Sequence, residues 1–179
     1  MNLKPRPFAP TALLLCFFLL AGTGLCLEGT EYQIKGAMMV NFIKFVEWPE
    51  PSPDQPPGEI IVGIVGKHNF GDALDAVSGK LIGERILSIR YISTLNQISG
   101  CRVLFIPASE AHRHRQILRA VSGRPVLTIG EDPNFVRMGG IIRFYAEEDH
   151  IRFEINQTEA LRANLKLSAK LLEIAGAVY

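Results

Sequence analysis

The stretch Glu59-Ile-Ile-Val-Gly-Ile-Val65 decides the fold class of this chain. It is a continuous apolar run of strand length that stops at Gly66, and such runs are typical of strands buried on both faces of a sheet. Residues 72–77 predict a short helix, and the alternating residues 85–91 predict a second strand. Strand–helix–strand units of this spacing predict a largely parallel sheet with helices on its faces.

The same alternation of elements continues downstream. Residues 102–106 predict another buried strand, after which Ser109 is expected to cap a helix over 110–121 that Gly123 ends. Residues 125–129 predict a fourth strand. The expected fold is therefore α/β, a single three-layer Rossmann-like domain with a mostly parallel sheet.

The last part of the chain changes character. Asp132-Pro133 is expected to open a short helix. Residues 141–145 and 151–155, joined by the acidic Glu147-Glu148-Asp149, predict a C-terminal antiparallel hairpin. After a helical stretch over 158–163, a final helix is expected to have Ser168 as its N-cap and three apolar residues as its buried stripe: Leu171, Ile174 and Val178.

The N-terminal residues 1–26 are interpreted as a cleaved signal peptide, which leaves 27–179 as the domain. Lys4 and Arg6 precede a nine-residue apolar run over 12–20, well short of the roughly 20 residues that span a bilayer. Cleavage after Gly24 and cleavage after Cys26 are both compatible with the small residues there. We therefore expect the protein in the periplasm.

The charge balance argues against a nucleic-acid partner. The whole chain has 19 basic and 18 acidic residues, a net charge of +1. Loss of Lys4 and Arg6 with the signal peptide leaves 17 basic against 18 acidic residues, or −1. A protein that binds nucleic acid through phosphates needs a basic surplus.

The first helix of the domain is expected over 31–46 and is nearly saturated with apolar residues, so most of its surface must be buried. Gln33, Asn41 and Lys44 fall close to one stripe, which is the expected solvent face. Trp48-Pro49 ends this helix, and the proline-rich segment 50–58 is expected to be a loop.

No motif points to catalysis, a cofactor or a metal. The glycines in 63–71 match neither the dinucleotide fingerprint nor a P-loop, because Lys67 is not followed by Ser or Thr, so we interpret them as chain turns. His112 and His114 stand two apart on a predicted helix and point in different directions, which favours a solvated face over a metal site. Cys101 is the lone cysteine that we expect to remain after export, and it is predicted to be a buried, structural thiol. We expect the protein not to be an enzyme.

Several segments in order along the chain resemble the YfiR-like family. They are Lys35-Gly-Ala37, Asn41-Phe-Ile-Lys-Phe-Val-Glu-Trp48-Pro49, Gly123-Arg-Pro-Val-Leu-Thr-Ile-Gly130, Phe135-Val-Arg-Met-Gly-Gly-Ile-Ile-Arg-Phe144, Arg152-Phe-Glu-Ile-Asn156 and Leu165-Lys-Leu-Ser-Ala-Lys-Leu-Leu172. The resemblance implies a periplasmic α/β protein, often a homodimer, that represses an inner-membrane diguanylate cyclase by binding its periplasmic domain. It also implies an outer-membrane lipoprotein that sequesters the repressor, and a role in cyclic-di-GMP signalling and biofilm formation.

The chain departs from the family in its cysteines. The resemblance implies a disulfide between the strand near position 63 and Cys101, but Gly63 stands at that place and a second cysteine pair is missing. We therefore expect no redox control through Cys101.

Five residues are the candidate partner contacts. Glu154 and Asn156 fall on the polar face of the predicted hairpin, with Ile142 and Phe144 on the adjoining strand, and Trp48 ends the first helix. Two alternatives stay open: Glu154 as a cross-strand ion-pair partner of Arg143, and Trp48 as part of the core.

A second function remains open beside the repressor. Ligand crevices commonly form at the strand ends of an open parallel sheet. The alternative is thus a periplasmic sensor of a small ligand that passes its signal to a membrane receptor or histidine kinase.

Overall fold

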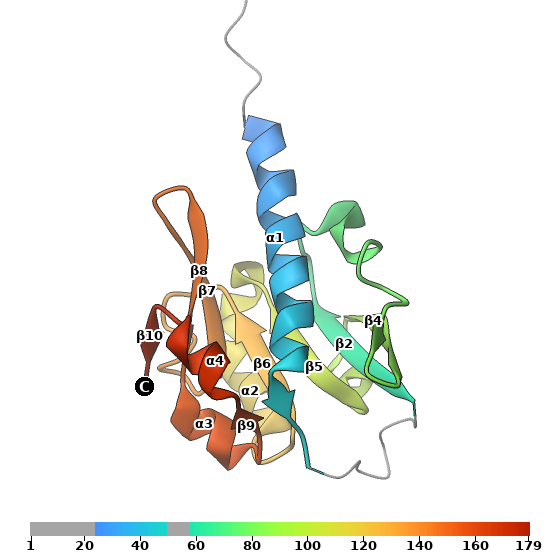
Figure 1. The fold of residues 1–179 in the computed structure, drawn as a ribbon, viewed down its shortest axis with the longest axis vertical. Coiled ribbons are helices and arrows are strands. Elements are labelled where there is room, and N and C mark those ends of the chain that lie inside the picture. Colours follow the sequence, from blue (N-terminus) through green and yellow to red (C-terminus); the bar gives the residue numbers. More distant parts are fainter. Residues whose placement is uncertain (1–23, 50–57) are drawn as a thin grey trace, which may run out of the picture.

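The computed structural model describes residues 24–49 and 58–179, and its principal feature is one eight-stranded sheet between helices (Figure 1). Residues 1–23 of the predicted signal peptide and most of the predicted loop 50–58 lie outside the described residues. The strand order is β10-β8-β7-β6-β5-β2-β4-β3. The strands are β2 (Glu59–Val65), β3 (Leu81–Ile82), β4 (Arg85–Ile92), β5 (Cys101–Ile106), β6 (Leu127–Gly130), β7 (Ile142–Glu147), β8 (His150–Ile155) and β10 (Ala177–Val178).

The pairing confirms the predicted fold class. β2 pairs in parallel with β4 and β5, β5 with β6, and β6 with β7, whereas β7 and β8 form the predicted antiparallel hairpin. A separate two-stranded sheet joins β1 (Val46–Glu47) to β9 (Lys166–Leu167). The hairpin turn is tight because Glu148 adopts a positive φ of 50°.

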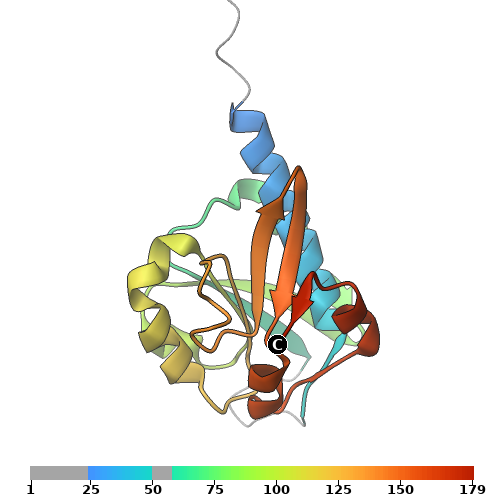
Figure 2. The same ribbon diagram turned by 90° about the vertical axis from the view of Figure 1, so that its left-hand side faces the viewer.

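Two hydrophobic clusters cover the two faces of the sheet, which makes the domain three-layered. Figures 1 and 2 show helix α1 (Gly24–Lys44) on one face and helix α2 (His114–Val121) on the other. On β2, Ile60, Val62 and Ile64 pack into the α1 cluster, and Ile61 and Val65 pack into the α2 cluster. Burial of alternate residues on opposite faces explains why β2 is apolar throughout.

Helix α1 presents the faces that the sequence predicts. Gln33, Asn41 and Lys44 are exposed, whereas Met39 and Phe42 are buried against the sheet. The helix ends at Lys44, two residues before the predicted end at residue 46, because Val46–Glu47 leaves the helix to pair with β9. Within the described residues, no helix is both long and apolar enough to cross a bilayer.

The predicted helix over 110–121 is divided in two. A 3₁₀ helix, η3 (Ala108–Arg113), precedes α2, and Glu110 within η3 has non-helical dihedral angles (φ −97°, ψ 16°). The prediction that Ser109 caps the helix is wrong, because its Oγ instead donates a hydrogen bond to the carbonyl of Lys67 at 2.9 Å. A contact between two loops thus replaces the local cap.

Two other predicted helices are shorter than the sequence suggests. The helix expected over 72–77 is one 3₁₀ turn, η1 (Gly71–Leu74). The helix expected after Asp132 is instead a series of turns, because the Asp132 side chain accepts a hydrogen bond from the amide of Asn134 at 2.8 Å. An aspartate that bonds the backbone two residues on stabilises a turn in place of a helix.

The C-terminal segment contains α3 (Gln157–Arg162) and α4 (Ala169–Glu173). Ser168 caps α4 as predicted, and its Oγ accepts from the amide of Leu171 at 3.3 Å. Leu171 is buried, but the prediction that Ile174 and Val178 complete a buried stripe is wrong, because they are 64% and 42% exposed. The helix ends at Glu173, so the 3.6-residue period no longer applies to Val178, which lies in β10.

Candidate functional site

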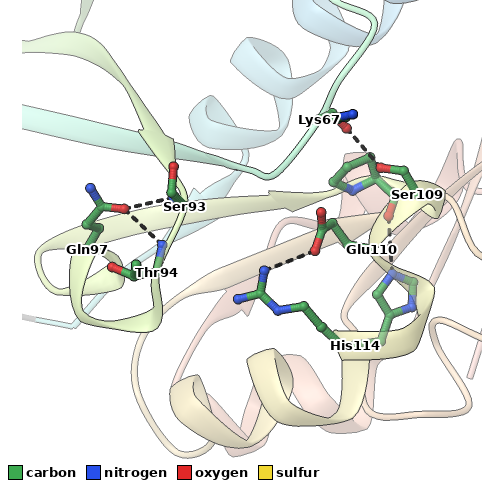
Figure 3. Close-up of polar contacts among 9 residues, drawn as sticks. Lys67, Ser93, Thr94, Gln97, Ser109, Glu110 and His114 are labelled. Atoms are coloured by element: carbon green, nitrogen blue, oxygen red, sulfur yellow. Dashed lines mark hydrogen bonds and ion pairs between the residues drawn. The ribbon is translucent and has the colours of Figure 1, made fainter.

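The carboxyl ends of β2 and β5 meet where the strand order reverses, the usual place of a ligand crevice in an open parallel sheet. In this protein the chain's own groups fill the space beside Gly66. A Cβ added to Gly66 would lie 2.0 Å from Oε1 of Glu110, so the carboxylate occupies the position that only a glycine leaves free. Figure 3 shows Glu110 and the Ser109–Lys67 hydrogen bond between the two loops.

On the α1 side of the same sheet edge lies a buried charge cluster. Lys35, which is 5% exposed, forms ion pairs with Glu31 and Glu131, the latter at 2.5 Å between Nζ and Oε1. Glu131 follows β6, and its Oε2 accepts from the amide of Ala108 at 3.3 Å. Burial, and then the Glu131 carboxylate, raise the pKa of Tyr32 above its ordinary value. The cluster holds α1 to the carboxyl ends of the strands.

The carboxylates of Glu110 and Glu131 disfavour phosphate binding by the glycine-rich segment 63–71. Glu110 and Glu131 stand at the sheet edge where a phosphate would have to bind, and they would repel it. Gly66 has a φ of +62° and turns the chain after β2, as the sequence predicts. Sequence reasoning missed Lys35 and Glu131, since they are 96 residues apart and the contact is purely tertiary.

The two histidines on the predicted helix have different surroundings. His112 is exposed, but the expectation of a solvated face is wrong for His114, which is fully buried. His114 Nε2 lies 3.3 Å from the carbonyl oxygen of Pro107, and Figure 3 shows this contact of His114. The imidazole ring of His114 packs edge-on against Phe135. Among the described residues, no group of three or more His, Cys, Asp or Glu side chains has the arrangement of a metal site.

Cys101 is the structural thiol that the sequence predicts. It is 1% exposed in the α2 cluster, and its burial raises the pKa of the thiol despite the nearby Arg90 and Arg124. A thiol that stays protonated and inaccessible has no nucleophilic role.

Glu154, the first candidate partner contact, is engaged within the chain. It lies opposite Arg143 on the neighbouring strand and accepts from Arg143 Nε at 2.7 Å. Its other oxygen accepts from the hydroxyl of Tyr179 at 3.2 Å, and the residue is only 7% exposed. The ion-pair alternative is therefore confirmed, and direct contact of Glu154 with a partner stays a prediction.

Asn156 connects three parts of the fold. Its Oδ1 caps α3 by accepting from the amide of Glu159 at 3.0 Å, and its Nδ2 donates to the carbonyl of Val136 at 2.9 Å. Both functional groups of the amide are thus used to fix the end of β8. A partner would have to compete with these bonds.

Ile142 and Phe144 point into the core. They are 0% and 1% exposed, and Phe144 stacks on Phe42 of α1 with ring centroids 5.5 Å apart. A partner would reach either side chain only after α1 had left the sheet, so their role as contacts stays a prediction.

Trp48 is partly buried against the α1 cluster. The guanidinium carbon of Arg102 lies 5.8 Å from its ring centroid, in the range of a cation–π contact. Trp48 Nε1 and Arg102 Nε are both buried without a hydrogen-bond partner among the described residues. Burial lowers the pKa of Arg102. The position favours the core alternative for the indole ring.

The exposed apolar side chains identify a surface that sequence reasoning missed. We define the C-terminal edge as Ile174, Val178 and Tyr179, which are 64%, 42% and 60% exposed. Val178 lies on the edge strand β10, which pairs in parallel with β8 beside Glu154, and Tyr179 bonds to Glu154. The predicted residue Glu154 therefore supports this edge from within.

Comparisons with known proteins agree with the fold. A model of the YfiR/HmsC-like family matches residues 32–176. A conserved domain protein from Vibrio cholerae O1 biovar El Tor is similar in structure, with 10% identity, a TM-score of 0.55 and coverage of 83% of this chain. The ABC domain of a Streptococcus pneumoniae protein, solved in complex with L-Trp, is similar with 11% identity, a TM-score of 0.54 and coverage of 80% of this chain.

This chain spans 60% of the length of each of those two structures, and their identity to it is low, so they bear on the fold alone. The family match covers nearly all of the α/β domain, from Tyr32 in α1 to Gly176, the residue before β10. The protein therefore belongs to the YfiR/HmsC-like family.

Proposed function

We propose that the protein is a periplasmic negative regulator that binds the periplasmic domain of an inner-membrane diguanylate cyclase and restrains cyclic-di-GMP signalling. The observation that carries the proposal is the family match over residues 32–176. The family is regulatory and is associated with diguanylate cyclase signalling. The absence of a metal cluster among the described residues and the burial of Cys101 are compatible with a binding protein.

The C-terminal edge is the surface that we propose for the cyclase. Two-residue edge strands such as β10 leave backbone groups unpaired, and exposed apolar side chains on such an edge are typical of protein–protein contacts. The ion pair of Glu154 and Arg143 would keep this edge rigid, which lowers the entropy cost of binding.

The opposite edge of the sheet is the surface that we propose for a second copy of the chain. Leu81 on β3 and Ile86 on β4 face each other across the pair and are 69% and 49% exposed, and Tyr91 is 53% exposed. A homodimer formed there would leave the C-terminal edge free for the cyclase. An outer-membrane lipoprotein would release the cyclase by competing for the C-terminal edge.

Binding to the purified periplasmic domain of a cyclase encoded beside this gene tests the proposal. Val178→Asp should weaken binding at least tenfold, because it places a charge in an apolar contact, whereas Leu81→Asp at the opposite edge should not. Deleting the gene should raise cyclic-di-GMP and biofilm formation, and cell fractionation should recover the protein in the periplasm. Unchanged cyclic-di-GMP in the deletion strain would contradict the proposal.

A second candidate is the small-ligand sensor. It is supported by the open parallel sheet and by the similarity in fold to a domain whose structure contains L-Trp. Thermal unfolding in the presence of a metabolite panel that includes L-Trp would support a sensor if one compound raises Tm. A flat result across the panel would argue against it.

A further inference from the structure

A cavity of about 520 Å³ lies between α2 and α3, and its lining includes residues of both the α1 cluster and the α2 cluster. It is distinct from the C-terminal edge, from the opposite edge of the sheet and from the charge cluster around Lys35. Sites for small ligands usually have volumes of about 300–1,000 Å³. The cavity is therefore large enough for a small molecule.

The floor of the cavity is apolar and fixed. Leu118, Val121, Val126, Ile141 and Ala163 all line it and are all less than a tenth exposed. Leu118 and Val121 lie on α2, whereas Val126 and Ile141 directly precede β6 and β7, and Ala163 directly follows α3. A floor made of several packed elements is preformed and stabilises an apolar group placed on it.

The rim of the cavity is cationic. Arg115 and Arg119 lie one turn apart on the same side of α2, and Arg162 projects from α3. The rim contains one acid, Glu159, which is already paired with Arg162 at 2.5 Å. Three guanidinium groups against one carboxylate leave a net charge of +2. The C-terminal end of α2 opposes this with only about half a negative charge.

Arg115 and Arg119 have no acidic partner within the described part of the chain. Like charges at i and i+4 destabilise a helix slightly. Each guanidinium has five donors in a planar fork that fits the oxygens of a carboxylate or phosphate. The repulsion between Arg115 and Arg119 thus slightly destabilises α2, and their guanidinium N–H groups are available to bind an anion.

We propose that this cavity binds a small amphipathic anion, a carboxylate or phosphate group carried on a compact apolar body. The apolar body packs on the floor, and Arg115, Arg119 and the free donors of Arg162 bind the anionic group. The inference does not depend on the cyclase proposal, because the cavity shares no residue with the C-terminal edge.

NMR titration of the ¹⁵N-labelled protein with three probes tests this inference. Phenylacetate, phenyl phosphate and the neutral phenylacetamide share the aromatic body, so they separate the contribution of charge from that of the floor. We expect at least one of the two anions to shift the backbone amide signals of α2 and α3, with saturation in the millimolar range. Phenylacetamide should bind at least tenfold more weakly than that anion. The anion that binds with the higher affinity then shows whether the cavity prefers a carboxylate or a phosphate group.

Arg115→Gln/Arg119→Gln should weaken binding of that anion at least tenfold. Both side chains are exposed and have no ion-pair partner among residues 24–49 and 58–179, so the fold should persist, as a urea unfolding curve would verify. Lys80→Gln/Arg152→Gln removes two exposed charges elsewhere and should leave the affinity unchanged. The inference is overturned if no probe shifts these amides, if phenylacetamide binds as tightly as the anions, or if the arginine variant binds like the control.

Discussion

The thiol sulfur of Cys101 lies 3.0 Å from the position that a Cβ on Gly63 would occupy. Across a disulfide, an S–S bond of about 2.04 Å places each Cβ about 3 Å from the other sulfur. Gly63 on β2 and Cys101 on β5 are therefore arranged as the two halves of a crosslink from which one sulfur is missing. The disulfide that the family resemblance implies at this place is geometrically compatible with this backbone.

Gly63→Cys should form a disulfide with Cys101 under oxidising conditions. The crosslink between positions 63 and 101 should stabilise the oxidised variant by about 2–4 kcal/mol relative to its reduced form. Urea unfolding with and without reductant measures the gain, and mass spectrometry of proteolytic peptides locates the crosslink.

Gly63→Ala is the matched control, because it adds the Cβ without the bond. That Cβ would lie 2.9 Å from Leu104 Cδ1 and 3.1 Å from Ile92 Cγ1, so the variant should lose about 1–3 kcal/mol. An unlinked Gly63→Cys protein would contradict the geometric argument.

Lys35→Met should destabilise the protein by about 3–5 kcal/mol, because it leaves the Glu131 carboxylate buried without a cation. Urea unfolding measures the loss. The double variant Lys35→Met/Glu131→Gln should recover part of it, since the only carboxylate of the cluster that then lacks its cation is the partly exposed Glu31.

Arg152→Ala is the control for this pair, because it breaks the exposed ion pair with Glu147 at the hairpin. We expect it to cost less than about 1 kcal/mol. Equal losses for Lys35→Met and Arg152→Ala would mean that burial of the Lys35 cluster has no energetic consequence.

Glu154→Gln should lower stability by about 1–3 kcal/mol, since it weakens the bonds from Arg143 and Tyr179. In a double-mutant cycle with Arg143→Met, the two losses should be clearly less than additive. If Glu154→Gln instead leaves the unfolding curve unchanged and weakens binding to the cyclase domain, Glu154 is a direct partner contact and not a supporting residue.

The stability of the protein should fall as the pH rises above about 9. Burial raises the pKa of Cys101 in the folded state above its ordinary value of 9.0, so the unfolded chain loses the thiol proton first and is favoured at alkaline pH. The contribution is complete below the ordinary pKa and is lost above it. Unfolding free energies of wild type and Cys101→Ala should therefore converge between pH 8 and the alkaline limit of folding, whereas parallel curves would contradict the burial argument.

Local patterns predicted the strands well. Residues 59–65 were predicted as a strand and form β2, and the hairpin was predicted within two residues of its ends. Both predictions depend on apolar period and turn residues within a single segment. The helix predicted over 110–121 is divided into η3 and α2, and the helix predicted after Asp132 is absent from the described residues, where the side chains of Ser109 and Asp132 bond elsewhere than to a helix terminus.

The candidate partner residues also show that the local sequence does not predict contacts between distant segments. Alternation along 151–155 correctly separated Phe153 from Arg152, and it placed Glu154 on the polar face of the hairpin, although Glu154 is buried. Arg143 and the β10 segment cover that face, and the return of residues 177–178 alongside β8 has no signal in the local sequence. Exposure of Ile174 and Val178 was missed for the same reason.

The sequence by itself determined the α/β class, the apolar strands, the burial of α1 and the membership in a regulatory family, because these depend on periodicity and on motifs that are read along the chain. Only the tertiary structure decided where the charged and polar groups go: Lys35 between two glutamates, Glu110 against Gly66, and Arg115 and Arg119 on the rim of a cavity. Burial of a charge is stable only with a partner or a solvent-facing opening, and both are set by elements that are distant in sequence.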